Sequence, residues 1–155
     1  MHLPAITEEG VLPEGIHDCS LDVVRTMFAS SGERAVMLDR FNHFLKRLEE
    51  FVPDNPVTIY LDGSFITAWE GCQDINVVIE ARDFEGDKSG FLQLLVSAEV
   101  RREFYENYKV VIHVVVPGLA ILDHRQWFQQ VKPIEAWRFG NEITALRKGI
   151  IRLKS

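Results

Sequence analysis

Apolar residues recur at helical spacing in two early segments of the chain. Over about 33–52 they fall mostly three or four positions apart, which predicts a long amphipathic helix that two prolines end. The same spacing on a shorter scale predicts a helix over 21–29. Residues 1–18, before these helices, contain two prolines and two glycines. We therefore expect an irregular N-terminal lead-in.

Short β-branched runs predict the strands. They lie at Val57–Leu61, at Ile75–Ile79 and at 110–116, and the last of these is rich enough in valine to predict a central strand. Between the second and third strands, apolar spacing predicts a helix over 91–107. Further helices are predicted over 121–131 and 134–148.

The chain ends in KGIIRLKS, which predicts either a short edge strand or an extended arm. Helix, strand, strand, helix, strand, helix is an α/β or α+β order, in which a small mixed sheet is flanked by helices. A chain of 155 residues fits one domain, which we place over 19–155 after the irregular lead-in.

Composition narrows the classes of function. Seventeen basic and 23 acidic residues give a formal net charge of −6, which disfavours broad binding to nucleic acid or to anionic membranes. No apolar stretch approaches the roughly 20 residues of a membrane span, and the N-terminus lacks the pattern of a signal peptide. Two cysteines are too few for a disulfide framework. We therefore expect a cytoplasmic protein without a membrane partner.

One motif carries candidate chemistry. The strand at 57–61 runs into Asp62-Gly63-Ser64, and Asp74-Ile75-Asn76 opens the next strand. A Gly-Ser turn permits close approach of the backbone to a phosphate, and the serine hydroxyl adds a donor. The two-residue period of a strand places the side chains of Asp74 and Asn76 on one face, as ligands of a shared Mg²⁺ would require.

At these residues the chain resembles the nucleotidyltransferase superfamily, which includes minimal nucleotidyltransferases and the antitoxins of toxin–antitoxin pairs. The closer resemblance is to a prokaryotic and phage family of small nucleotidyltransferase-like proteins. Its members combine an early LPxGIH segment, a YxDGSFxT strand end, an Asp-x-Asp pair and a WxxF…KGIxR tail. This chain has LPEGIH at 12–17, YLDGSFIT at 60–67, Trp127-Phe128, and KGIIR at 148–152. The resemblance covers nearly the whole chain and implies a nucleotidyltransferase-like fold.

Two departures bear on activity. Asn76 replaces the second acidic ligand, and its amide oxygen can bind a hard cation but brings no charge. The third acid should lie on the strand at 110–116, whose one polar residue is His113. Imidazole suits zinc or a transition metal better than Mg²⁺. Asp62 is a fourth candidate ligand if its side chain turns toward the others. A hydrogen-bonded histidine of the strand is the alternative reading of His113.

The expected function is therefore a non-catalytic interaction module with a degenerate site, either antitoxin-like or an accessory of phage or host defence. Its expected partner is a protein, with a nucleoside triphosphate or a second copy as further options. The alternative is an active Mg²⁺-dependent enzyme that transfers a nucleotidyl group to a protein or RNA hydroxyl. Asp74 and Asn76 would then be catalytic metal ligands, and Gly63, Ser64 and Arg152 would contact phosphates. Without activity, no cofactor is expected.

The last third of the chain offers two more candidates. Four aromatic residues there could stack on a base or could form the core between two helices: Trp127, Phe128, Trp137 and Phe139. A basic cluster could reach triphosphate oxygens or an acidic partner, or could be a solvated helix face with a frayed tail: Arg138, Arg147, Lys148, Arg152 and Lys154.

Overall fold

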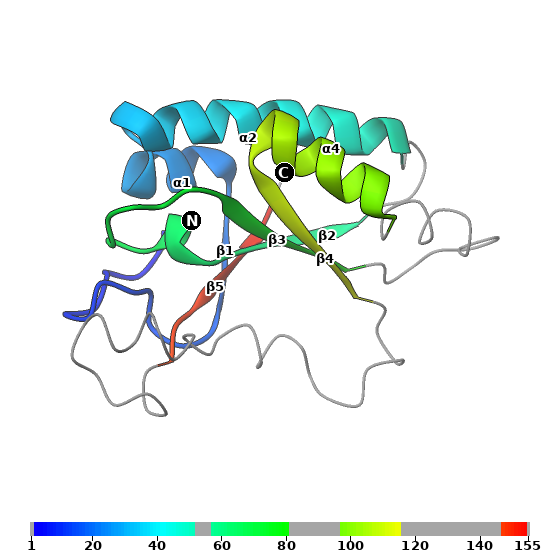
Figure 1. Cartoon of the computed structure of the whole chain (residues 1–155). Helices are drawn as coiled ribbons and strands as arrows, with labels where there is room; N and C mark the ends of the chain where they lie inside the picture. Colours follow the sequence, from blue (N-terminus) through cyan, green and yellow to red (C-terminus); the bar gives the residue numbers. More distant parts are fainter. Residues whose placement is uncertain (1, 52–56, 81–96, 116–146, 155) are drawn as a thin grey trace.

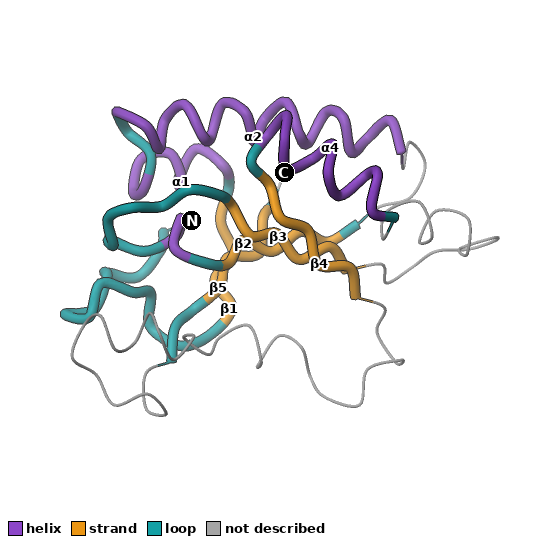
Figure 2. Tube along the Cα trace, in the orientation of Figure 1, coloured by secondary structure: helices purple, strands orange, loops and turns teal. Residues whose placement is uncertain are grey.

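The computed structural model describes residues 2–51, 57–80, 97–115 and 147–154. These residues form an α+β domain in which helices pack on a five-stranded mixed sheet (Figures 1 and 2), as the sequence predicted. The α-helices are α1 (Leu21–Phe28), α2 (Gly32–Phe51) and α4 (Ala98–Tyr108). The strands are β1 (Ile16–Cys19), β2 (Thr58–Asp62), β3 (Ile75–Glu80), β4 (Val110–Val115) and β5 (Ile150–Leu153).

The observed strands and their order correct three expectations from the sequence. The order is β1-β5-β2-β3-β4, with β5 parallel to β1 and β4 parallel to β3, while β2 is antiparallel to both of its neighbours. The C-terminal tail is thus an inner strand, and the predicted edge strand or arm is wrong. The valine-rich strand β4 is an edge of the described sheet and not a central strand. The prediction of an irregular lead-in is wrong for residues 16–18, which belong to β1.

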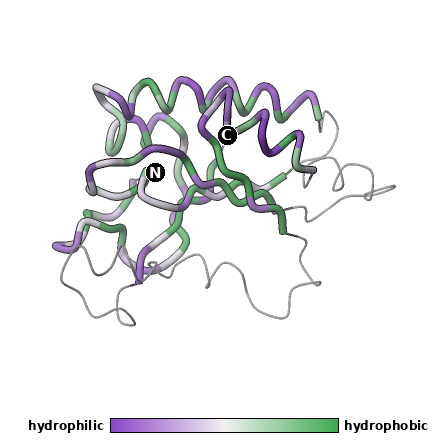
Figure 3. The backbone as a smooth tube through the Cα atoms, in the orientation of Figure 1, coloured by the Kyte–Doolittle hydropathy of each residue, from purple (hydrophilic) through white to green (hydrophobic). Residues whose placement is uncertain are grey.

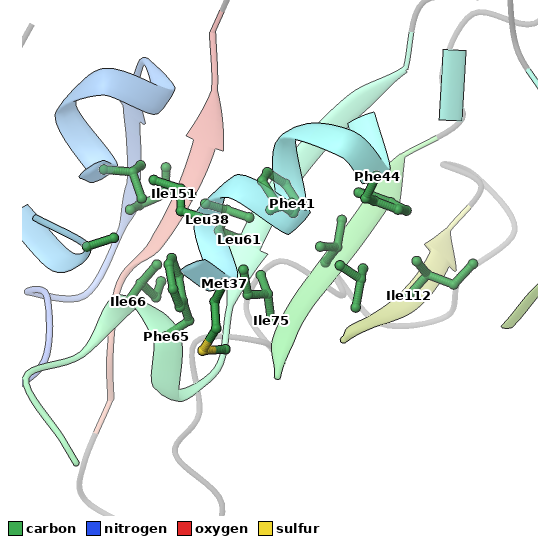
Figure 4. Packing of buried hydrophobic residues seen from close by; sticks show 14 of the residues in the cluster. Met37, Leu38, Phe41, Phe44, Leu61, Phe65, Ile66, Ile75, Ile112 and Ile151 are labelled. Carbon is green, nitrogen blue, oxygen red and sulfur yellow. The ribbon is translucent and has the colours of Figure 1, made fainter. Parts of the chain in front are cut away.

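The helices cover one face of the sheet (Figure 1). Figure 3 shows the physical reason: β3 and β4 are mostly hydrophobic, whereas α2 alternates between hydrophilic and hydrophobic residues and can bury only one side. In Figure 4, Leu38 and Phe41 of α2 lie over Leu61 and Ile75 of the sheet. Phe44 continues this core toward α4, where its ring meets that of Phe104 edge-on at 5.1 Å between centroids.

The opposite face of the sheet carries most of its polar side chains. Cross-strand partners point to the same face, so the register defines a row that crosses all five strands: Asp18, Arg152, Tyr60, Val78 and His113. Within the described residues, no helix lies on this face.

Polar contacts on this face satisfy its buried groups. The Tyr60 hydroxyl donates to Glu80 Oε2 at 2.7 Å, and both side chains are buried. Burial, together with this hydrogen bond, raises the pKa of Tyr60. Arg152 donates to both carboxylate oxygens of Asp18, at 2.6 and 2.9 Å, and this pairing lowers the pKa of Asp18. The Asp18–Arg152 pair joins β1 to β5.

The N-terminal and C-terminal segments are in direct backbone contact. The Gly149 amide donates to Leu12 O at 2.9 Å, and the Ile150 amide donates to Gly15 O at 3.0 Å. A Cβ at Gly149 would collide with Pro13 O and lie 2.6 Å from His17 Nε2, which is itself 2.7 Å from Pro13 O. The LPEGIH and KGIIR segments therefore depend on each other: only glycine at position 149 lets the two backbones approach this closely.

None of the helices in the described ranges has both the length and the apolar character needed to cross a membrane. Several expectations fall on residues that the structure does not describe. They are the helix over 121–131, most of the helix over 134–148, residues 91–96 of the helix over 91–107, the four aromatic residues and Arg138. Of the second of these helices only 147 and 148 are described, and neither is helical.

We predict that Gly149→Ala lowers the free energy of unfolding by about 2 kcal/mol, because the new methyl group must push the N-terminal segment away from β5. Chemical denaturation followed by circular dichroism measures this loss. Lys154→Ala is the matched control: its side chain is 43% exposed at the end of the same strand, and the expected change is within about 0.5 kcal/mol. Equal stability of the glycine and alanine proteins would contradict the close backbone contact.

Candidate functional site

The predicted motif forms the end of β2 and the beginning of β3. Gly63 has a φ of +80°, a left-handed conformation that other residues rarely adopt, and Ser64 opens the short 3-10 helix η1 (Ser64–Ile66). A Cβ at Gly63 would lie 2.5 Å from the Asn76 amide nitrogen. Glycine is therefore required both by the backbone conformation and by the nearby Asn76 side chain. Phe65 and Ile66, which are buried, anchor this turn in the core (Figure 4).

The structure brings Asp62, Asp74 and Asn76 together. Asp62 and Asn76 are direct partners across β2 and β3, so their side chains share the face opposite the helices. Asp74 immediately precedes β3, and its Oδ1 is 3.5 Å from Asn76 Nδ2. The predicted sharing of one face by positions 74 and 76 is consistent with this contact. Asn76 turns its amide nitrogen, not its oxygen, toward the carboxylate.

Asp62 is paired with a lysine that approaches from the C-terminal segment. Lys148 Nζ donates to Asp62 Oδ1, and the two side chains are only 5% and 13% exposed. The solvated-tail alternative is therefore wrong for Lys148. The lysine belongs to the KGIIR segment, but nothing in the sequence indicated that its partner would be Asp62, 86 residues earlier.

Ser64 contacts a cysteine that sequence reasoning did not select. The Ser64 side chain hydrogen-bonds the Cys72 thiol, and Cys72 Sγ donates to the backbone oxygen of Asp74 at 3.2 Å. Burial raises the pKa of the Cys72 thiol, while the hydrogen bond from Ser64 and the charge of Arg34 oppose that increase. Cys72 thus links the Gly-Ser turn to the residue that precedes β3.

Arg34, in the first turns of α2, holds the loop that follows the Gly-Ser turn. Its guanidinium donates to three backbone oxygens, those of Phe65 at 2.6 Å, Trp69 at 2.5 Å and Ser64 at 3.3 Å. It also lies over the Phe65 ring, 5.7 Å from the centroid. The planar fork of arginine suits several carbonyls at once. No local pattern indicated this role, because the contacts span 30 to 35 residues.

His113 and Arg152 do not join this group. His113 on β4 pairs with Val78 on β3. It is therefore a diagonal neighbour of Asn76, at roughly 8 Å between Cα atoms. Arg152 lies in the same row as His113, three strand spacings or roughly 14 Å away. Arg152 is bound to Asp18 and lies opposite Tyr60, four residues before Ser64. The expected metal ligand His113 and the expected phosphate contact Arg152 are therefore well separated.

The register also identifies the position where a third acid would lie. The partner of Asn76 on β4 is Val111, so the row at this end of the sheet reads Asp62, Asn76, Val111. The three side chains share one face. Of these three side chains only the Asp62 carboxylate is charged, and it is already paired with Lys148.

These residues do not fit a Mg²⁺ ion. Mg²⁺ requires near-octahedral oxygen ligands, usually with one or two carboxylates free to coordinate it. Here Asp62 accepts from an ammonium, and Asn76 directs its nitrogen toward Asp74. Across the four described ranges, no group of three or more histidine, cysteine or acidic side chains could hold a metal ion.

We predict that Arg34→Met lowers the free energy of unfolding by about 2 kcal/mol, because three carbonyl oxygens lose a charged donor. Urea denaturation measures the loss. Arg40→Ala is the control on the same helix, where the residue is exposed and the expected change is within about 0.5 kcal/mol. Equal effects of the two substitutions would show that the loop does not depend on Arg34.

Comparison with curated proteins and with solved structures finds no match. A family model, described as a family of unknown function (DUF6932), matches residues 4–154. The match includes the N-terminal segment, the Gly-Ser turn and the C-terminal strand, the three parts that meet in the structure. The chain belongs to this family, DUF6932.

Proposed function

We propose that this protein is a nucleotidyltransferase-like interaction module whose site does not catalyse nucleotidyl transfer. One observation carries the proposal: the row Asp62, Asn76, Val111 at the end of the sheet. Three adjacent strands present side chains there on one face, and only one of the three is charged. The Gly63-Ser64 turn and Asp74 resemble a nucleotidyltransferase site. This resemblance supports a nucleotidyltransferase-like fold but not the transfer reaction.

The chemistry of nucleotidyl transfer explains why this row matters. In-line displacement at a phosphate builds negative charge on the attacking and leaving oxygens, and metal ions held by carboxylates stabilise that charge. Valine at position 111 offers no ligand, and the amide of Asn76 offers no charge. Asp74 remains as the one carboxylate without a basic partner among the described contacts, which is the lower end of what a Mg²⁺–phosphate site uses.

The Gly-Ser turn is also engaged within the protein. Ser64 hydrogen-bonds Cys72, and the backbone oxygen of Ser64 accepts from Arg34 and from the Thr67 hydroxyl. These contacts favour a rigid turn that preserves the shape of the domain. A rigid surface built on a transferase-like scaffold suits recognition of a protein partner, which is the role that we propose.

We predict that the purified protein transfers no label from radiolabelled ATP, GTP, CTP or UTP to protein or RNA. The assay contains Mg²⁺ or Mn²⁺ and a cell lysate as the source of acceptors. Asp74→Ala serves as the matched blank, because it removes the one acid of the site that has no basic partner among the described contacts. Labelled product that the wild type forms and Asp74→Ala does not form would overturn the proposal in favour of an active transferase.

The interaction role predicts a partner that binds in fixed stoichiometry. A tagged copy expressed in its native host should co-purify with one protein, and the complex should re-form from the two purified components. Light scattering coupled to size-exclusion chromatography measures the mass of the complex and of the protein alone. A strict monomer that re-forms no complex, yet binds a Mg²⁺–nucleoside triphosphate tightly, would contradict the interaction role.

A further inference from the structure

The Lys148–Asp62 pair is the most buried ion pair among those that the described residues form, with side chains 5% and 13% exposed. Burying an ammonium or a carboxylate alone is strongly unfavourable, so each of these two groups requires the other. The pair lies where β2 ends, on the face that also carries Asn76 and the nearby Asp74. Lys148 is thus the cation at a cluster of oxygen-bearing side chains.

Backbone contacts fix the position of this ammonium. Lys148 directly precedes Gly149, whose amide donates to Leu12 O, and the Ile150 amide donates to Gly15 O. β5 then pairs with β1 on one side and with β2 on the other. A lysine whose backbone is held in this way keeps its ammonium beside Asp62 with little further loss of conformational entropy.

We propose that Lys148 is the built-in cation of this site, which therefore takes no divalent metal ion. The inference rests on the proposed function in one respect, since that function describes this site as one that does not catalyse metal-dependent transfer. It goes further, because it assigns the charge that a metal would supply to a particular side chain. Removing that charge should convert Asp62, Asp74 and the Asn76 amide into a weak site for Mg²⁺ or Mn²⁺, since hard cations prefer oxygen ligands.

The test compares Lys148→Met with the wild type. The methionine fills a similar volume without charge, so Asp62 becomes a buried carboxylate with no counter-ion, and the variant should melt at a lower temperature. Addition of 10 mM MgCl₂ or MnCl₂, against KCl at equal ionic strength, should raise its melting temperature by roughly 3–4 °C. The wild type should melt at the same temperature with divalent cation, with KCl and with EDTA.

Two controls isolate the charge. Lys148→Arg keeps a cation beside Asp62 and should show no response to Mg²⁺ or Mn²⁺. The double variant Lys148→Met/Asp62→Asn removes the carboxylate as well, and its response to divalent cation should disappear. Titration of Mn²⁺ followed by electron paramagnetic resonance should show at least about tenfold tighter binding to Lys148→Met than to the wild type, one factor of ten being 1.4 kcal/mol.

Two results would overturn the inference. One is a wild type that binds Mn²⁺ as tightly as Lys148→Met does, and the other is a folded Lys148→Met with no response to divalent cation. If the methionine variant does not fold, Lys148→Gln takes its place. If neither variant folds, the test rests on the wild type: Mn²⁺ binding to it overturns the inference, and no binding supports it. If this inference is overturned but the wild type transfers no label, the proposed function still stands. Label transfer by the wild type overturns the proposed function.

Discussion

The fold depends on the insertion of the last strand, β5, between β1 and β2. This strand is parallel to the N-terminal strand and antiparallel to β2, so one four-residue segment satisfies the backbone groups of two neighbours. Gly149 permits the approach, because any side chain there would meet Pro13 and His17. With β5 in place, Arg152 reaches Asp18 and Lys148 reaches Asp62. The two ends of the chain therefore complete both the sheet and the candidate site.

The two faces of the sheet have different physical roles. Apolar side chains of β2, β3 and β5 meet α2 on one face and form the main core (Figure 4). The other face carries the pairs Asp18–Arg152 and Tyr60–Glu80 together with the candidate site. Buried polar groups stabilise a protein only when each has its partner, and these pairs provide them. A single register thus places the apolar core on one face of the sheet and the polar pairs on the other.

The electrostatics of the site follow from the same insertion. Asn76 and Val111 leave Asp62 as the one charged residue of its row, and Lys148 neutralises it. A carboxylate that already has an ammonium has little affinity for a metal ion, because binding would require breaking a buried pair. The single charge of this row and the ammonium that pairs with it are thus two aspects of one arrangement.

The sequence by itself determined the elements whose signal is local. Helices over 21–29 and 33–52, the strands containing Leu61, Ile75 and Ile112, and the Gly63-Ser64 turn all follow from spacing, β-branching and turn chemistry, and the structure has them. Sharing of one face by Asp74 and Asn76 followed from the period of a strand.

Only the tertiary structure decided which strands became neighbours, and with that the site. Hydrophobic pattern predicts that a segment is a strand but not its place in the sheet. In the described sheet, valine-rich β4 is an edge and polar-flanked β5 is an inner strand. Arg34 and Cys72 gave no local signal, and Lys148 was indicated only as part of a basic cluster, because the roles of all three arise from contacts that the folded chain makes. Pairing across β2, β3 and β4 placed Val111, and not His113, beside Asn76. Register and strand order thus decided which side chain of β4 lies beside Asn76 and which cation pairs with Asp62, and local sequence does not encode these long-range properties.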